Sequence, residues 1–181
     1  MKSKILLHSC CAPCSSSVIE CLTPDYDITI IYYNPNIEPE EEYLKRKEEQ
    51  IKLLKKLFIP YIEATYDNEE FKNITKEYDK EKEGGHRCKI CYELRLEKVA
   101  VVAKKNNFEY FGTTLTVSPY KNSEIINKIG LQLAKKNNIK YLTTDFKKND
   151  GYKRSIELAK EYNLYRQNYC GCLYNSEENE K

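Results

Sequence analysis

Three short groups of cysteines are the residues best suited to chemistry in this chain of 181 residues. The groups are Cys10-Cys11-x-x-Cys14, Cys88-x-x-Cys91 and Cys170-x-Cys172, and the eighth cysteine is Cys21. A CxxC pair brings two thiolates to one metal with little backbone strain, and two such pairs can close a tetrahedral site. In a reducing compartment, grouped cysteines favour metal or redox chemistry over disulfides. We therefore predict metal binding, and we interpret Cys21 as a small core residue on a helix.

The seven grouped cysteines exceed what one metal site needs. A cubane iron–sulfur cluster takes four thiolates, and three would remain to hold a second metal with an open position. Cys10 and Cys11 are neighbours whose side chains leave an extended backbone in opposite directions, so we expect them to serve two centres. Structural zinc uses the same spacings, and a redox-active CxxC pair is another alternative. The surplus favours iron, since structural zinc leaves no thiolate spare.

Composition indicates a soluble, globular protein of one compact domain. Hydrophobic residues make up 40% of the chain and charged residues 32%, and the formal net charge is +2. No run approaches the roughly eighteen consecutive apolar residues of a membrane span, and the apolar run near the start is too short for a signal peptide. We therefore predict a cytoplasmic protein. The charge permits an RNA partner without arguing for one.

Strand and helix patterns alternate along the chain. We expect strands at 4–9, 28–34, 59–66, within 108–118 and at 139–146, and helices at 15–22, 39–57, 90–106, 122–137 and 151–162. Ser15 to Ser17 are expected to cap the first helix, and Pro39 fits the first turn of the second. In that second helix, Leu44, Ile51, Leu54 and Phe58 fall on one face. The polar residues 68–89 are interpreted as a loop.

The alternation predicts an α/β fold. We expect a single Rossmann-like domain over residues 1–174, with a parallel sheet of about five strands covered by helices on both faces. Residues 175–181 form a polar tail that we expect to be disordered. Ligands of such sheets gather outside the carboxyl ends of the strands. The first cysteine group, residues 113–122 and Asp145 follow or end three strands, and we expect them to converge there.

Five motifs together resemble one known family. HSCCAPC (8–14), YYNPNI (32–37), EGGHRCKICYELRL (83–96), TTLTVSPYKN (113–122) and YRQNYCGC (165–172) are similar, in order and spacing, to motifs of the epoxyqueuosine reductase family of QueH type. The resemblance covers about residues 4–174. It implies a cobalamin-independent enzyme that reduces epoxyqueuosine in the tRNA anticodon to queuosine, with electrons from an external donor. It also implies a [4Fe–4S] cluster beside a protein-bound iron, on an adenine-nucleotide hydrolase-like sheet.

The resemblance and the cysteine count lead to an assignment of site residues. We place Cys11, Cys14, Cys88 and Cys91 on the cluster and Cys10, Cys170 and Cys172 on the second iron, where zinc is the alternative metal. Catalytic roles are expected for Asp145 and Tyr120, and substrate contacts for Tyr33, Asn34, Asn36, Arg87, Arg95 and Lys121. The alternatives are a helix or turn cap for Asp145 and ion pairs for Arg87 and Arg95. His8 is expected to be a buried, hydrogen-bonded histidine more than a residue that tunes the site.

Two rival functions fit parts of the pattern. A tRNA sulfur-transferase or adenylating enzyme on the same kind of sheet needs a glycine-rich phosphate loop such as SGGxD after the first strand. HSCCAPC occupies that position here. A non-catalytic, zinc-stabilised RNA-binding domain would use the cysteines as structural ligands, and the cysteine surplus argues against it.

Overall fold

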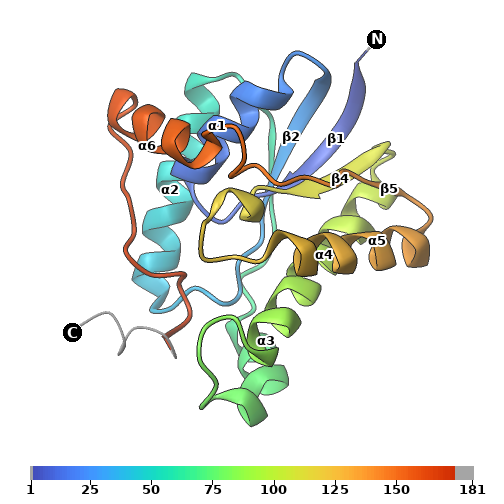
Figure 1. Cartoon of the computed structure of the whole chain (residues 1–181), viewed down its shortest axis with the longest axis vertical. Coiled ribbons are helices and arrows are strands. Elements are labelled where there is room, and N and C mark those ends of the chain that lie inside the picture. Colours follow the sequence, from blue (N-terminus) through green and yellow to red (C-terminus); the bar gives the residue numbers. More distant parts are fainter. Residues whose placement is uncertain (1, 174–181) are drawn as a thin grey trace.

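A five-stranded parallel sheet forms the centre of the molecule in the computed structural model, which describes residues 2–173 (Figure 1). The strands are β1 (Ser3–His8), β2 (Tyr26–Tyr32), β3 (Tyr61–Glu63), β4 (Tyr110–Thr113) and β5 (Lys140–Tyr141). Their order is β3-β2-β1-β4-β5, and every neighbouring pair is parallel. The predicted α/β fold is therefore confirmed. The tail predicted at 175–181 lies outside the described residues.

Helices cover both faces of this sheet. The helices are α1 (Ala12–Leu22), α2 (Glu40–Lys56), α3 (Asn68–Thr75), α4 (His86–Lys105), α5 (Ser123–Asn137) and α6 (Gly151–Glu161). Alternate side chains of β1 point to opposite faces, so Ile5 and Leu7 pack with α1 and α2 while Leu6 packs with α4 and α5. Figure 1 shows α1 and α6 together on one side and α4 and α5 on the other. Helix α3 packs against α4.

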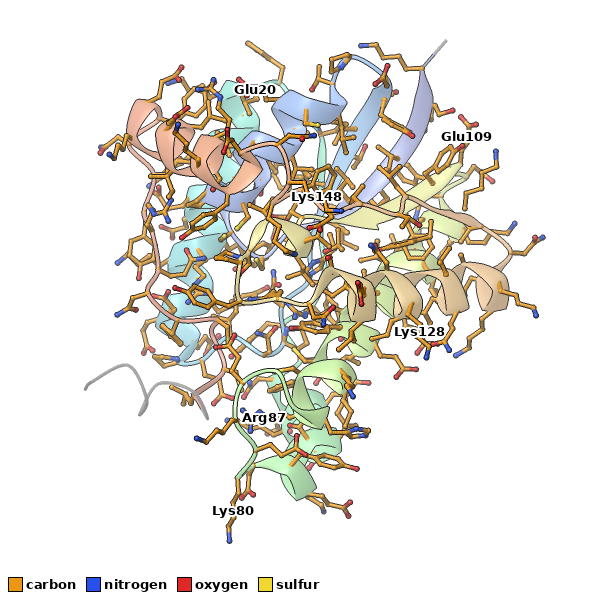
Figure 2. All side chains as sticks on the ribbon, viewed as in Figure 1. Glu20, Lys80, Arg87, Glu109, Lys128 and Lys148 are labelled. Atoms are coloured by element: carbon orange, nitrogen blue, oxygen red, sulfur yellow. The ribbon has the colours of Figure 1, made fainter. Side chains whose placement is uncertain are left out.

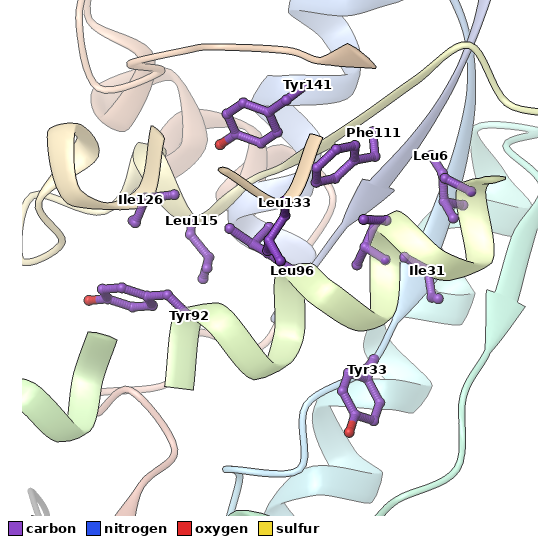
Figure 3. Close-up of a cluster of buried hydrophobic side chains, with 13 residues drawn as sticks. Leu6, Ile31, Tyr33, Tyr92, Leu96, Phe111, Leu115, Ile126, Leu133 and Tyr141 are labelled. Carbon is purple, nitrogen blue, oxygen red and sulfur yellow. The ribbon is translucent and has the colours of Figure 1, made fainter. Parts of the chain in front are cut away.

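The larger core lies between the sheet and helices α4 and α5 (Figure 3). Leu96, Val99, Ala100 and Ala103 of α4 are fully buried there, as their helical spacing predicts. Phe111 of β4 contacts Tyr141 of β5, with ring centroids 5.0 Å apart. This core fixes α4 against the sheet, and the first turns of α4 carry Cys88 and Cys91.

The start of α1 differs from the prediction. The helix begins at Ala12 with Cys11 in the N-cap position and Pro13 in the first turn. Proline suits this turn because its φ is already helical and its missing N–H needs no partner. Ser15, Ser16 and Ser17 are therefore inside the helix, and their hydroxyls donate to the carbonyls of the preceding turn. The expected capping by these serines is wrong.

The face of α2 that packs inward also differs. Phe58 is 93% exposed and Leu44 is exposed. The buried residues of α2 are Tyr43, Arg46, Gln50, Leu53 and Leu54. They have helical spacing and include the predicted Leu54, but two of them are polar, so the pattern of apolar residues alone identified only part of the buried face.

The stretch 68–89 is more ordered than predicted. It contains α3, a 3-10 helix at Lys76–Tyr78 and the first residues of α4. Phe71 of α3 is fully buried, and Arg87 lies inside this end of the molecule (Figure 2), where it donates to the carbonyls of Tyr78 and Asp79 at 2.8 and 3.1 Å. Cys88 and Cys91 consequently lie on a helix and not on a loop. None of the described helices combines the length and apolar character needed to cross a membrane.

Gly130 of α5 provides a test of the packing between α5 and β5. A Cβ atom at Gly130 would overlap the ring of Tyr141, whose hydroxyl donates to Asn127. We expect Gly130→Val to lower the free energy of unfolding by about 2 kcal/mol, because the buried ring must move. Chemical denaturation measures this change. The exposed neighbour Leu131→Val is the control and should change it by less than about 0.5 kcal/mol. Equal losses in both variants would contradict the packing.

Candidate metal centre

Three cysteines gather where the chain leaves β1 and enters α1. The sulfur atoms of Cys10, Cys11 and Cys14, here called the N-terminal triad, all lie within 4.8 Å of one another. Cys10 and Cys11 have their sulfurs 3.9 Å apart, although we expected them to diverge. That expectation is wrong because the backbone turns from strand to helix at this point. The triad is therefore close enough for its three sulfurs to hold one metal ion or one face of a cluster.

The other four grouped cysteines line one small cavity of about 20 Å³, here called the narrow cavity. Cys88 and Cys91 come from the first turns of α4, and Cys170 and Cys172 from the C-terminal segment. Gly171 between them has φ +109°, and a Cβ there would lie 2.7 Å from Ile37 Cγ1. This turn therefore requires glycine. The turn brings the two flanking cysteines, Cys170 and Cys172, to the narrow cavity.

The structure places the seven cysteines in two groups, the N-terminal triad and the four that line the narrow cavity. The predicted cluster set of Cys11, Cys14, Cys88 and Cys91 draws on both the triad and the narrow cavity. The predicted iron set of Cys10, Cys170 and Cys172 does the same. All seven lie in the triad or line the narrow cavity, and Cys21 is exposed on α1. The core location expected for Cys21 is therefore wrong, because its position on α1 faces solvent. The division of the seven between two centres stays a prediction.

A larger cavity of about 230 Å³, here called the wide cavity, opens beside the cysteines. It is lined by Cys10, Pro13, Cys14, Glu83, Leu115, Ser118, Pro119, Tyr120, Lys121, Tyr152, Ser155 and residues 166–170. Glu83, Lys121 and Cys170 line both cavities. Tyr120 is 77% exposed. The wide cavity therefore leads from solvent to the cysteines.

Charge in the site is arranged around the triad. Hydrogen bonds with Cys11 and Cys14 hold the pKa of Cys10 well below its ordinary value, and the bond with Cys10 raises the pKa of Cys11 to about 12. Burial raises the pKa of Cys91 to about 11. Within the triad, these hydrogen bonds therefore favour the thiolate at Cys10, and metal binding must displace the protons held by the other two thiols.

Two cations, the buried Arg95 and the half-buried Lys121, lie among the cysteines. Arg95 is on α4, one turn after Cys91, and its Nε donates to the Cys91 carbonyl at 3.1 Å. Burial lowers the pKa of Lys121, but the electrostatic influence of the neighbouring Cys170 and Cys10 more than offsets this and raises it. Both side chains therefore stay charged and offset the negative charge of thiolates. Arg95 is buried and Lys121 lines both cavities, so of the two only Lys121 faces the space open to a substrate.

His8 ends β1 and is completely buried. Burial lowers its pKa to about 4, so the ring is neutral. Nε2 lies 2.9 Å from the carbonyl oxygen of Tyr33 and must donate, which leaves Nδ1 to accept from the Thr113 hydroxyl at 3.2 Å. The expected buried, hydrogen-bonded histidine is confirmed. The two hydrogen bonds of His8 connect the carboxyl ends of β1, β2 and β4.

Several other predicted site residues have structural contacts. Asn34 donates to the Ser9 carbonyl at 2.8 Å, and the ring of Tyr33 lies under the Lys98 ammonium. Asn36 and the buried Arg87 line the narrow cavity. Substrate contacts by these residues stay predictions.

Asp145 does not join the cysteines. β5 ends at Tyr141, so the predicted strand to residue 146 is too long and Asp145 follows it by four residues. Its carboxylate pairs with Lys147 at 2.9 Å and Lys148 at 3.9 Å, and it lines neither the wide nor the narrow cavity. The catalytic role of Asp145 stays a prediction without support from this geometry.

Sequence reasoning missed two buried residues of α2 that support the site. Gln50 Oε1 lies 2.7 Å from the hydroxyl oxygens of both Ser9 and Ser15, on either side of the triad. Arg46 donates to the carbonyls of Tyr169 and Cys170 at 3.2 and 3.3 Å. Their spacing of four residues was a signal that they share a face, but their polarity suggested solvent.

The family model and the curated relatives that match this chain carry the same family name. The family model described as "Epoxyqueuosine reductase QueH" matches residues 5–178. A curated epoxyqueuosine reductase QueH of Staphylococcus epidermidis is 46% identical over 96% of this chain and 76% of that protein. The protein of the same name from Thermotoga maritima is 36% identical over 94% of this chain and 88% of its own length.

Solved structures show the same fold at low identity. A predicted subunit of tRNA methyltransferase from Methanocaldococcus jannaschii has a TM-score of 0.59 at 19% identity, covering 88% of this chain and 75% of that one. The U34-tRNA thiolase NcsA from Methanococcus maripaludis, solved with its [4Fe-4S] cluster, has a TM-score of 0.61 at 14% identity, covering 96% and 61%. These two matches show the fold alone. The cysteine groups and the family match over nearly the whole chain together show that this chain belongs to the epoxyqueuosine reductase QueH family.

Proposed function

We propose that this chain is an epoxyqueuosine reductase that acts on tRNA. The reaction removes the oxygen of the epoxycyclopentane ring as water and leaves a cyclopentene, which consumes two electrons and two protons. One observation carries the proposal: seven cysteines from three distant segments reach the triad and the narrow cavity, beside a wide cavity that opens to solvent. An external donor must supply the electrons. Because tRNA is a cytoplasmic molecule, we propose a cytoplasmic location.

The donor set fits an iron–sulfur centre. Soft thiolates select iron–sulfur clusters and zinc over hard cations, and seven of them exceed one structural zinc site. The buried Arg95 and the half-buried Lys121 supply positive charge where several thiolates would otherwise repel one another. We therefore propose a [4Fe–4S] cluster and an adjacent iron held by the seven cysteines, with zinc as the alternative metal. When bound, these groups supply single electrons and a Lewis acid for the epoxide oxygen.

The residues of the chain itself bind the substrate and stabilise the charge that develops on the leaving oxygen. The wide cavity admits the modified base from solvent, and Tyr120 at 77% exposure offers a ring on which a base of the anticodon can stack. The Lys121 ammonium lines both cavities, so it can donate a hydrogen bond to the oxygen that leaves the ring. Gln50 bonds the Ser9 hydroxyl and Arg46 bonds the Cys170 carbonyl. These bonds hold in place the segments that carry the cysteines.

A direct assay tests the function. Anaerobically purified enzyme is incubated with tRNA bearing epoxyqueuosine and a chemical reductant, and the digested nucleosides are identified by mass spectrometry. We expect a product that has lost one oxygen atom and matches queuosine. A protein loaded with iron and sulfide that leaves epoxyqueuosine unchanged would refute the proposal.

The two rival functions lack support from specific observations. Sulfur transfer through an adenylated intermediate needs a phosphate loop after β1, where this chain has the N-terminal triad. The likeness to the thiolase extends to the fold and not to function, since identity is 14%. A zinc-stabilised RNA-binding domain has no need of a cavity beside its metal ligands.

A further inference from the structure

Glu83 is the one carboxylate among the described residues that line the wide and narrow cavities, and it lines both. It lies in the loop before α4, followed by Gly84 with φ +90°. The nearby Glu81 accepts a hydrogen bond from the Arg87 backbone at 2.9 Å and so has a structural role. Within residues 2–173, no salt bridge is formed by Glu83. Glu83 is an exposed residue, and its carboxylate, which forms no salt bridge within the described protein, is available to a cationic ligand.

The wide cavity has further features that suit a flat, polar ligand. Tyr120, Tyr152 and Tyr169 contribute aromatic rings to its lining. Gln167 also lines it, and its buried Oε1 has no hydrogen-bond partner among the described residues. A buried acceptor without a donor is costly unless a ligand supplies the donor. The cavity therefore combines tyrosine side chains, one carboxylate beside the cations Lys121 and Arg166, and one acceptor without a partner among the described residues.

The modified base of the proposed substrate has the complementary chemistry. Its 7-deazaguanine ring is flat and carries N–H donors, and a secondary amine, protonated at neutral pH, links that ring to the epoxycyclopentane. We propose that the wide cavity binds this base with the Glu83 carboxylate paired to the secondary ammonium. Gln167 Oε1 then accepts from a ring N–H, and the tyrosines pack on the ring. This inference rests on the proposed function.

The position of Glu83 gives the pairing a consequence for the reaction. Glu83, Lys121 and Cys170 line both cavities, so they mark the place where the two meet. An ammonium held by Glu83 puts the attached cyclopentane ring within reach of that place. Glu83 therefore selects substrates that carry the charged linker, and it orients the epoxide toward the cysteines and the Lys121 ammonium.

Equilibrium binding tests the pairing without turnover. The iron-loaded full chain is titrated anaerobically with tRNA bearing queuosine, which retains the ammonium but has no epoxide, and with the same tRNA bearing guanosine at that position. The readout is the ratio of the two dissociation constants. We expect the wild type to prefer the queuosine tRNA, and Glu83→Gln to reduce that preference about tenfold, as for loss of one charged hydrogen bond.

A matched variant controls for general electrostatics. Glu77 is exposed in the 3-10 helix of the same region and lines neither cavity. Glu77→Gln removes the same charge from the tRNA's surroundings, so it should shift both dissociation constants alike and leave their ratio unchanged. The inference is overturned if Glu83→Gln keeps the full preference, or if a wild type that reduces epoxyqueuosine shows no preference. Failure of the proposed function looks different, because the wild type would then also fail to reduce epoxyqueuosine.

Discussion

Replacing Cys11 with serine is expected to abolish epoxyqueuosine reduction, whereas replacing Cys21 with serine leaves it unchanged. Both cysteines belong to the first helical segment, Cys11 buried at the N-cap of α1 within the N-terminal triad and Cys21 exposed on the outer face. A serine hydroxyl is a hard, protonated group that does not replace a soft thiolate on iron. Loss of a supporting residue around a metal costs up to about a hundredfold, and loss of a ligand should exceed this.

The measurements are iron content, the visible absorption of the anaerobic protein and the rate of conversion of epoxyqueuosine tRNA. Cys11→Ser should lose iron and activity together while its far-ultraviolet circular dichroism stays that of the wild type. Cys21→Ser should match the wild type in all four. A Cys11→Ser protein with normal iron content and rate would mean that the N-terminal triad is not a metal site.

Replacing Arg46 with methionine is expected to lower the free energy of unfolding by about 3–5 kcal/mol, the usual cost of removing one partner of a buried ion pair. Arg46 is buried against Glu42, with Nε 2.6 Å from the carboxylate. Its other nitrogens bind the carbonyls of Tyr169 and Cys170, and its guanidinium lies 4.9 Å from the Tyr169 ring centroid. The segment that carries Cys170 and Cys172 loses this anchor in the variant, so iron retention should fall as well.

Two further variants separate the loss of stability from the loss of iron retention. Arg154 forms an exposed pair with Glu20, and Arg154→Met should leave the free energy of unfolding nearly unchanged. The double variant Glu42→Gln with Arg46→Met removes the unpaired carboxylate, so it should recover part of the stability. It should not recover iron retention, because the carbonyls of the cysteine segment remain unanchored. Recovery of both would show that Arg46 acts through Glu42 alone.

The sequence predicted the fold well because its main signals are local. Apolar runs such as residues 5–7 become buried strands, and the helical spacing of Leu96, Val99 and Ala103 matches the face of α4 on the sheet. The order of strands and helices along the chain then limits the topology, since parallel strands need crossover helices. The same local signals placed Cys10 and Cys11 directly after the first strand, which the structure confirms.

Other features depended on tertiary contacts that no local pattern reports. Gln50 and Arg46 are buried because α2 packs against the triad and the C-terminal segment, and polar residues are normally interpreted as solvent-facing. Phe58 is exposed at the end of α2, where no other element covers it. Asp145 was expected at a strand end, but β5 has only two residues. Glu83 drew no attention because its role depends on the two cavities that it lines.

The metal content of the protein purified without oxygen tests the proposed iron–sulfur centre most directly. Iron, zinc and acid-labile sulfide are measured per chain in the wild type. We expect about five irons and about four sulfides per chain, as for one cubane cluster and a separate iron. One or two zinc ions without sulfide would contradict it, and would favour a zinc-stabilised RNA-binding domain in place of a reductase.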